Sequence, residues 1–140
     1  LYASIVTLIR YTLSMKEELS GVVTQFKGNG RKLGYPTANL SIETELEDGV
    51  YYGYAAMLHY KKHPSLIFIG TPSTMHDMIR LVEVHLLDIP DEDYYGQELS
   101  VTLEHYHRPN KTFETVEELK RIMKQDDLSA RNWFKNQTIA

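Results

Sequence analysis

The pattern of apolar and polar positions from Ser20 onward predicts a series of short strands. The runs are separated by Gly, Pro and acidic residues, a spacing that is typical of antiparallel barrels and sandwiches. In the last run, Leu99, Val101 and Leu103 alternate with polar residues, so these three side chains are expected to face the core. The expected strands are Gly21–Phe26, Gly49–Tyr60, Ser65–Gly70, Arg80–Asp88 and Glu98–His107.

Only the C-terminal end of the chain has the spacing of a helix. Thr115 and Glu118 form a capping box, in which a hydroxyl and a carboxylate bind amides that the helix itself leaves unpaired. Because the strands precede the helix, the pattern favours an antiparallel barrel with the helix packed on it. The first apolar stripe is Val116, Leu119, Ile122 and Met123, and a second short helical piece is expected to carry Leu128, Ala130, Trp133 and Phe134.

Length and composition are those of one globular domain. The chain has 140 residues, of which 42% are hydrophobic, and a chain of this length can bury one core without crosslinks. The absence of cysteine excludes disulfides and thiolate chemistry and suits a reducing compartment, so we expect a cytoplasmic protein. A net charge of −4 gives no overall attraction to nucleic acid or to anionic membranes.

The first residues differ from the rest of the chain. Leu1–Ser14 is apolar but interrupted by Arg10, and it is too short for a membrane-spanning helix of about 20 residues. It also lacks the features of a signal peptide. We therefore expect Leu1–Ser14 to be a leader or extension outside the fold, and residues 15–140 to form the domain.

A glycine-rich segment, Gly28–Asn39, is the densest chemical signal. Three glycines around Arg31 and Lys32 allow a tight backbone whose amides can surround phosphate. The segment matches neither a Walker A loop nor a dinucleotide-binding fingerprint. From the residues alone, a plain surface hairpin remains an alternative to a phosphate-binding loop.

Thr37 and Asn39 stand two residues apart after a proline, so an extended backbone would direct both side chains to one side. Their oxygens are hard neutral ligands that suit Mg²⁺, which takes its charge balance from substrate phosphates. The alternative is that both side chains bind amides of a turn.

Glu83 lies in a strand whose apolar face is Val82, Val84 and Leu86, so Glu83 and His85 are expected on the opposite face. A carboxylate there could orient an alcohol and accept its proton during phosphoryl transfer. The alternative is a solvated glutamate on the outside of a strand. The histidine pairs lack a third ligand at a suitable spacing, which disfavours a zinc site.

Taken together, these segments resemble the riboflavin kinase family over about Gly21–Arg131. No single segment is specific, but their order and spacing together are. The segments are Gly21-Val22-Val23, Gly30-Arg31-Lys32-Leu33-Gly34-Tyr35-Pro36-Thr37-Ala38-Asn39, Gly49-Val50-Tyr51-Tyr52-Gly53, Ile69-Gly70-Thr71-Pro72, Val82-Glu83-Val84-His85-Leu86-Leu87-Asp88, Tyr94-Tyr95-Gly96, and Arg108 with Lys111 and Phe113.

The resemblance implies a mainly β fold, a six-stranded antiparallel Greek-key barrel with a C-terminal helix. It also implies transfer of phosphate from ATP to riboflavin, giving FMN and ADP, with Mg²⁺ as cofactor and Zn²⁺ or Mn²⁺ as alternatives. Glu83 would be the catalytic base, and Thr37 and Asn39 would hold the metal. The other implied binding residues are Gly30, Arg31, Gly34 and Pro36 at the phosphates, Leu86, Asp88 and Tyr95 on the nucleotide side, and Arg108, Lys111 and Phe113 in the mobile loop near the flavin.

The expected partners are therefore small molecules, and neither nucleic acid nor membrane is expected. We expect a monomer, with an FAD synthetase domain upstream where the module is part of a longer chain, as in bacterial relatives. One alternative is a flavin- or nucleotide-binding barrel without catalysis. Another is a barrel that binds single strands by aromatic stacking, which the acidic balance disfavours.

Overall fold

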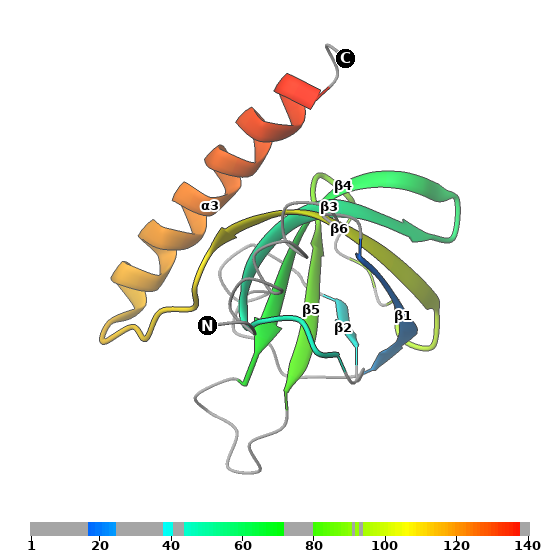
Figure 1. Cartoon of the computed structure of the whole chain (residues 1–140), viewed down its shortest axis with the longest axis horizontal. Helices are drawn as coiled ribbons and strands as arrows, with labels where there is room; N and C mark the ends of the chain where they lie inside the picture. Colours follow the sequence, from blue (N-terminus) through cyan, green and yellow to red (C-terminus); the bar gives the residue numbers. More distant parts are fainter. Residues whose placement is uncertain are drawn as a thin grey trace, which may run out of the picture.

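The structure, a computed structural model, describes residues 17–24, 38–40, 44–71, 80–90, 92 and 94–137. Within these ranges it has six strands followed by one helix (Figure 1). The expected leader Leu1–Ser14 lies outside the described residues. The elements are β1 Glu17–Thr24, β2 Ala38–Leu40, β3 Gly49–Met57, β4 Tyr60–Gly70, β5 Leu81–Leu86, β6 Glu98–Arg108 and α3 Val116–Gln137.

The strands close into a barrel in which all neighbours are antiparallel. Their order is β1-β2-β5-β4-β3-β6, and pairing of β6 with β1 closes the sheet. β3, β4 and β5 are adjacent in both sequence and space, while β6 returns to the free side of β3. The predicted mainly β, antiparallel fold with a C-terminal helix is confirmed.

The expected strand Gly49–Tyr60 was too long, because the chain reverses inside it. β3 ends at Met57 and β4 begins at Tyr60. Leu58 has a φ of 54°, a left-handed conformation that costs an L-residue of this kind of order 1–3 kcal/mol. Hairpin turns usually carry Gly, Asn or Asp at such positions, so no turn was predicted at Leu58. The three-residue strand β2 was not predicted either.

Alternate residues of the strands fill the barrel interior. Leu99, Val101 and Leu103 are 1%, 1% and 2% exposed, as the alternation in β6 predicted. Burial of a Leu or Val side chain contributes roughly 1.5–3 kcal/mol relative to exposure. This interior cluster therefore holds the barrel closed.

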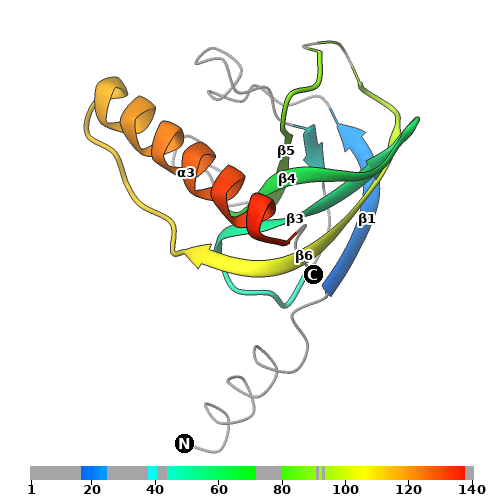
Figure 2. The same ribbon diagram turned by 90° about the horizontal axis from the view of Figure 1, so that it is seen from above.

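A second apolar cluster lies outside the barrel, where α3 packs against β3 and β4. Figures 1 and 2 both show α3 lying along one side of the barrel. β3 is consequently covered on both faces, and its first five residues are all buried. The buried residues of this outer cluster are Val50, Tyr52, Leu66, Leu87, Ala130 and Phe134.

The C-terminal region forms one continuous helix of 22 residues, so the prediction of a second, separate piece was wrong. Its buried positions recur every four residues, which is the spacing of one helical face. They are Ile122, Asp126, Ala130 and Phe134. Val116, which was expected to pack, is 55% exposed, and Leu128 is 59% exposed.

Half of the predicted capping box forms at the start of α3. The Thr115 hydroxyl accepts a hydrogen bond from the Glu118 amide at 3.1 Å, as expected for this motif. The Glu118 carboxylate accepts from the amide of Glu114 at 3.4 Å, one residue before the expected partner. The helix therefore begins where the sequence predicted.

Candidate functional site

Two candidate site residues are direct partners in the sheet. Asn39 of β2 pairs with Glu83 of β5. Glu83 in turn pairs with Phe68 of β4, Phe68 with Val50 of β3, and Val50 with Arg108 of β6. These five positions form one line across the strands, here called the outer row. Directly opposed positions of an antiparallel pair belong to one face of the sheet.

This face is the outside of the barrel. Val82, Val84 and Leu86 belong to the interior cluster, so Glu83 and His85 project outward, as predicted. Val50 and Phe68 of the outer row belong to the apolar cluster under α3. Glu83 therefore lies at the margin of the surface that the helix covers.

The Glu83 carboxyl is desolvated, and no residue in the described ranges places an opposite charge beside it. The side chain is half-buried, and burial raises the pKa of its carboxyl above the ordinary value. Among the described residues, none makes a hydrogen bond or an ion pair with it. Such a carboxylate is a stronger base than one in water, because its charged form is disfavoured.

Most of the candidate residues on the phosphate side belong to the segment between β1 and β2. Gly30, Arg31, Gly34, Pro36 and Thr37 lie outside the described residues. The end of β1 leads toward them in the sequence, and Thr24 at that end is the second sheet partner of Asn39. Thr24 and Glu83 thus flank Asn39 on the two neighbouring strands of the barrel.

Tyr95 lies in a turn held against β1. The Gly96 amide donates to the Val23 carbonyl at 2.9 Å, and the Val23 amide donates to the Gln97 carbonyl at 2.9 Å. Gly96 has a φ of 82°, which a glycine adopts without strain. The turn therefore lies beside the end of β1, and Tyr95 is 39% exposed there.

Leu86 and Asp88, the other nucleotide-side candidates, have different surroundings. Leu86 is 3% exposed and part of the barrel interior. Asp88 is exposed, with a φ of 61°, and both its oxygens accept from Arg131 of α3 at 2.8 Å. The Arg131 guanidinium holds the pKa of the Asp88 carboxyl below its usual range. Asp88 thus connects the end of β5 to the helix.

Arg108 closes the other end of the outer row and is also bound to α3. Its Nε donates to Asp126 Oδ1 at 2.8 Å, and its Nη2 donates to Asp126 Oδ2 at 2.6 Å. The Asp126 side chain is 3% exposed. Arg108 is the last residue of β6, so it belongs to a strand end rather than to the loop in which the resemblance would place it.

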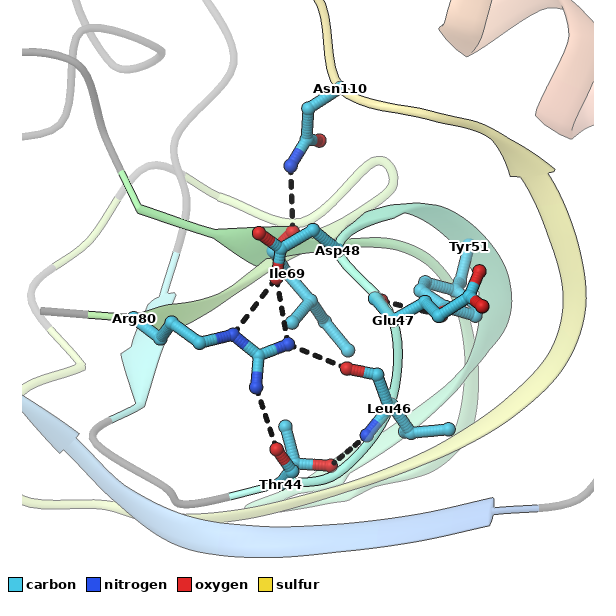
Figure 3. A network of polar contacts seen from close by, with 8 residues as sticks. All are labelled: Thr44, Leu46, Glu47, Asp48, Tyr51, Ile69, Arg80 and Asn110. Carbon is cyan, nitrogen blue, oxygen red and sulfur yellow. Dashed lines mark hydrogen bonds and ion pairs between the residues drawn. The ribbon is translucent and has the colours of Figure 1, made fainter. Parts of the chain in front are cut away.

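Lys111 and Phe113 follow in the segment between β6 and α3. Lys111 is exposed and Phe113 half-buried. The segment is attached to the barrel by Asn110, whose Nδ2 donates to the Ile69 carbonyl at 2.9 Å (Figure 3). A Cβ on Gly70 would lie 2.4 Å from that same Nδ2, so glycine at this position permits the contact.

Arg80 connects the start of β5 to the residues before β3. Figure 3 shows its guanidinium between the carbonyls of Thr44 and Leu46 and the Asp48 carboxylate. The Nη2–Oδ1 distance to Asp48 is 2.7 Å. Arg80 therefore fixes the beginning of the strand that carries Glu83.

Rings of the barrel and helix stack under α3. Tyr52 stacks on His107 with ring centroids 4.8 Å apart, and His105 stacks on Trp133 at 5.6 Å. Burial raises the pKa of Tyr52 to about 12 and lowers the pKa of both histidines. These rings contribute to helix docking.

The roles of Asp126, Arg131 and Arg80 in these contacts were not predicted from the sequence. A signal for Asp126 exists, because it stands four residues after Ile122 and four before Ala130, which makes it a carboxylate on an apolar helical face. Arg131 has a local i,i+4 signal through Asp127, but its contact with Asp88 and the contacts of Arg80 join residues far apart in the sequence, and no local pattern indicates those.

Within the described part of the chain, no three His, Cys, Asp or Glu side chains form a group that could hold a metal ion. In the same ranges, no helix is long and apolar enough to cross a membrane.

The geometry defines a class of protein: a closed antiparallel barrel with a C-terminal helix packed on it and a carboxylate on its outer face. The sequence model of the Flavokinase family, described as riboflavin kinase, matches residues 13–134. The chain therefore belongs to the riboflavin kinase family.

Curated relatives agree with this family. The chain is 35% identical over 118 residues to the bifunctional riboflavin kinase/FMN adenylyltransferase of Escherichia coli strain K12, covering 83% of this chain and 37% of that protein. It is 31% identical over 104 residues to the riboflavin kinase of Homo sapiens, covering 70% of this chain and 67% of that protein. The chain thus spans well under half the length of the bifunctional relative.

Solved structures share the fold. One, titled macrolide-efflux protein from Streptococcus pneumoniae, has a TM-score of 0.74 at 27% identity and covers 91% of this chain and 42% of that one. The riboflavin kinase from Trypanosoma brucei has a TM-score of 0.65 at 20% identity, covering 84% of this chain and 76% of that one.

Proposed function

We propose that this chain is an ATP:riboflavin 5′-phosphotransferase, which moves the γ-phosphoryl group of ATP to the 5′-hydroxyl of riboflavin and releases FMN and ADP. The observation that carries the proposal is the pairing of Asn39 with Glu83 across β2 and β5. Phosphoryl transfer needs mainly alignment and charge stabilisation. A neutral ligand beside a desolvated base suits that chemistry, and membership of the family supports it.

Glu83 is the proposed catalytic base. A primary alcohol is far too weak an acid to lose its proton at neutral pH without help, so a positioned carboxylate contributes typically 10²–10⁴-fold, an order-of-magnitude range. The raised pKa of Glu83 makes its charged form a better proton acceptor. As the hydroxyl oxygen bonds to the γ-phosphorus, its proton passes to a Glu83 oxygen and ADP leaves.

Thr37 and Asn39 would hold Mg²⁺, with Zn²⁺ or Mn²⁺ as alternatives. The donor set fits, since hydroxyl and amide oxygens are hard neutral ligands and a carboxylate stands at the sheet position next to Asn39. When bound, the ion neutralises charge on the phosphate oxygens. The two residues would fix the triphosphate at the β2 end of the outer row.

The order of the outer row supports an assignment of sides. Asn39 and Phe68 lie on strands flanking Glu83. If the triphosphate occupies the Asn39 side, the alcohol reaches Glu83 from the Phe68 and Arg108 side. We therefore assign the nucleotide to the Asn39 side and the flavin to the Arg108 side. Following the family resemblance, we add Gly30, Arg31, Gly34, Pro36, Leu86, Asp88 and Tyr95 to the nucleotide side, and Lys111 and Phe113 to the flavin side.

The barrel topology, domain bounds, oligomeric state and location are proposed by analogy with the riboflavin kinase family. We propose the family's six-stranded Greek-key barrel within a domain of residues 15–140, and the strand order β6-β3-β4-β5 supports this proposal. We further propose a cytoplasmic monomer that needs neither nucleic acid nor membrane. Where the module belongs to a longer chain, an FAD synthetase domain would precede it.

The test is direct conversion. Purified protein is incubated with ATP, Mg²⁺ and riboflavin, and the flavins are separated by chromatography. FMN that accumulates in step with ADP is the expected result. Riboflavin binding without FMN under varied metal and nucleotide conditions would support a non-catalytic flavin-binding barrel instead.

A further inference from the structure

Asp126 is a buried carboxylate on a helical face that is otherwise apolar. It lies between Ile122 and Ala130 along the buried stripe of α3 and is 2% exposed. A buried charge is costly unless it is paired. Both Asp126 oxygens bind Arg108, and Oδ1 also accepts from His107 Nε2 at 3.1 Å. The carboxylate is therefore committed to the last two residues of β6.

An irregularity in β6 allows two consecutive residues to reach one carboxylate. Neighbouring side chains of a regular strand point to opposite faces. Here Val50 pairs with Arg108 while Tyr51 pairs with Tyr106, so His107 has no partner on β3. A bulge of this kind redirects side chains and is frequent beside active sites. It brings His107 and Arg108 to the same side, toward α3.

The Arg108 guanidinium also reaches the segment that follows it. Its Nη1 donates to the Pro109 carbonyl at 2.9 Å. One side chain thus joins the helix, the end of β6 and the first residue of the segment that carries Lys111 and Phe113. This segment runs from the barrel to the start of α3 (Figure 1).

We propose that Asp126 is a positioning residue for the flavin side of the site, acting through Arg108. The inference rests on the proposed function. Asp126 sets the place of Arg108 at the end of the outer row and the path of the segment beyond it. Its effect should therefore fall on riboflavin rather than on ATP, since Asn39, a proposed ligand on the phosphate side, stands at the other end of that row.

A purely structural role explains the arrangement less well. Docking of α3 already has apolar packing by Ala130 and Phe134 and the surface pair of Asp88 with Arg131. A buried ion pair is often no more stabilising than well-packed apolar side chains of the same volume. A charge-dependent, two-oxygen contact is needed where the orientation of a guanidinium matters.

The experiment compares Asp126→Asn with Asp127→Asn. Both remove one negative charge from adjacent residues of α3, but Asp127 pairs with Arg131 on the surface. Steady-state kinetics give kcat and the KM for each substrate, and riboflavin binding is measured separately by quenching of flavin fluorescence. Emission from Trp133, the single tryptophan of the chain, reports helix docking, because its ring lies 5.6 Å from that of His105.

For Asp126→Asn, the KM and Kd for riboflavin should rise at least ~10-fold, the loss expected for one charged hydrogen bond. The KM for ATP, kcat and Trp133 emission should change little. Asp127→Asn should have the same kcat, KM values and riboflavin Kd as the parent. Asp126→Glu, which keeps the charge but displaces it, should give a smaller rise, and it replaces Asp126→Asn if that variant does not fold.

Two results would overturn the inference. One is an unchanged KM for riboflavin in a folded Asp126 variant. The other is a parallel loss in kcat and both KM values with altered Trp133 emission, which would assign Asp126 to helix docking alone. Failure of the proposed function is a separate result, because it would be seen as absent FMN with the parent protein.

Discussion

Asn39 and Glu83 are opposed partners on β2 and β5. Antiparallel pairing places such positions about 4.5–5.5 Å apart at Cα, so the amide residue of the Pro-Thr-Ala-Asn segment and the proposed base belong to adjacent strands of one sheet. The sheet ladder, rather than a flexible loop, sets their relation. A rigid framework of this kind is what alignment of a phosphate and an alcohol requires.

Replacement of Asn39 should change the metal requirement. Asn39→Ala removes one proposed neutral ligand, so the Mg²⁺ concentration for half-maximal activity should rise at least ~10-fold, since even outer partners of metal ligands cost that much. The measurement is a titration of initial rate with Mg²⁺ at saturating ATP. The control is Asn110→Ala, which also replaces an asparagine by alanine but on the segment after β6, where the amide binds the Ile69 carbonyl of β4. It should leave the Mg²⁺ concentration for half-maximal activity unchanged. Equal Mg²⁺ dependence of the two variants would remove Asn39 from the metal site.

Glu83 should make the fold less stable as the pH rises. Its folded pKa is raised by burial, so between its unfolded value of about 4.3 and the folded value the native state holds a proton that the unfolded state has lost. Stability therefore falls through that window and stays lower above it. Glu83→Gln should unfold at a higher temperature than the parent at pH 8, and the difference should shrink below about pH 4.3. A difference independent of pH would contradict the desolvated carboxyl.

His105 should destabilise the fold in acid. Burial and the neighbouring His107 lower its pKa, so as the pH falls below the unfolded value of about 6.5 the unfolded state gains a proton that the native state resists. Stability is lost from that pH downward to the folded pKa. His105→Phe keeps a ring against Tyr52 and Trp133 but cannot titrate. Urea unfolding between pH 7 and 5 should have a shallower pH dependence for this variant, whereas parallel curves would refute the prediction.

Gly70 and Asn110 should be coupled. A Cβ on Gly70 would lie 2.4 Å from Asn110 Nδ2 and would displace that amide from the Ile69 carbonyl. Gly70→Ala should therefore cost about 0.5–1.5 kcal/mol, the net value of one hydrogen bond. In the Asn110→Ala background the same change should cost less, because the amide is already gone. Unfolding free energies of the four combinations measure this coupling, and strict additivity would disprove it.

Gly53 provides the matched control for that cycle. A Cβ there would lie 2.0 Å from the Thr102 backbone oxygen, which cannot rotate away as a side chain can. Gly53→Ala should therefore be more destabilising than Gly70→Ala, and its cost should not depend on Asn110. A smaller cost at Gly53 would contradict the close approach of β3 and β6.

Local patterns predicted a large part of the fold. Alternation in β6 identified Leu99, Val101 and Leu103 as interior, and in β5 it placed Glu83 outside. The Thr115 cap marked the start of α3. These features depend on residues close together in the sequence, where side-chain period and backbone hydrogen bonding are linked.

The rest depends on contacts between distant segments. β2 has three residues, too few for a periodic signal, so its register opposite Glu83 could not be derived. The turn at Leu58 uses a conformation that its side chain disfavours. The pairing of Arg108 with Asp126 joins residues 18 apart in the sequence. The backbone pairing of Arg108 with Val50 places Arg108 at a strand end rather than in the expected loop.

Turnover by Glu83→Gln decides whether the carboxylate opposite Asn39 takes part in phosphoryl transfer. With saturating ATP, Mg²⁺ and riboflavin, this variant should form FMN at least ~10²-fold more slowly than the parent, while its Kd values for flavin and nucleotide stay close to those of the parent. Near-normal FMN formation by Glu83→Gln would contradict the account, because the carboxylate opposite Asn39 would then take no part in the transfer.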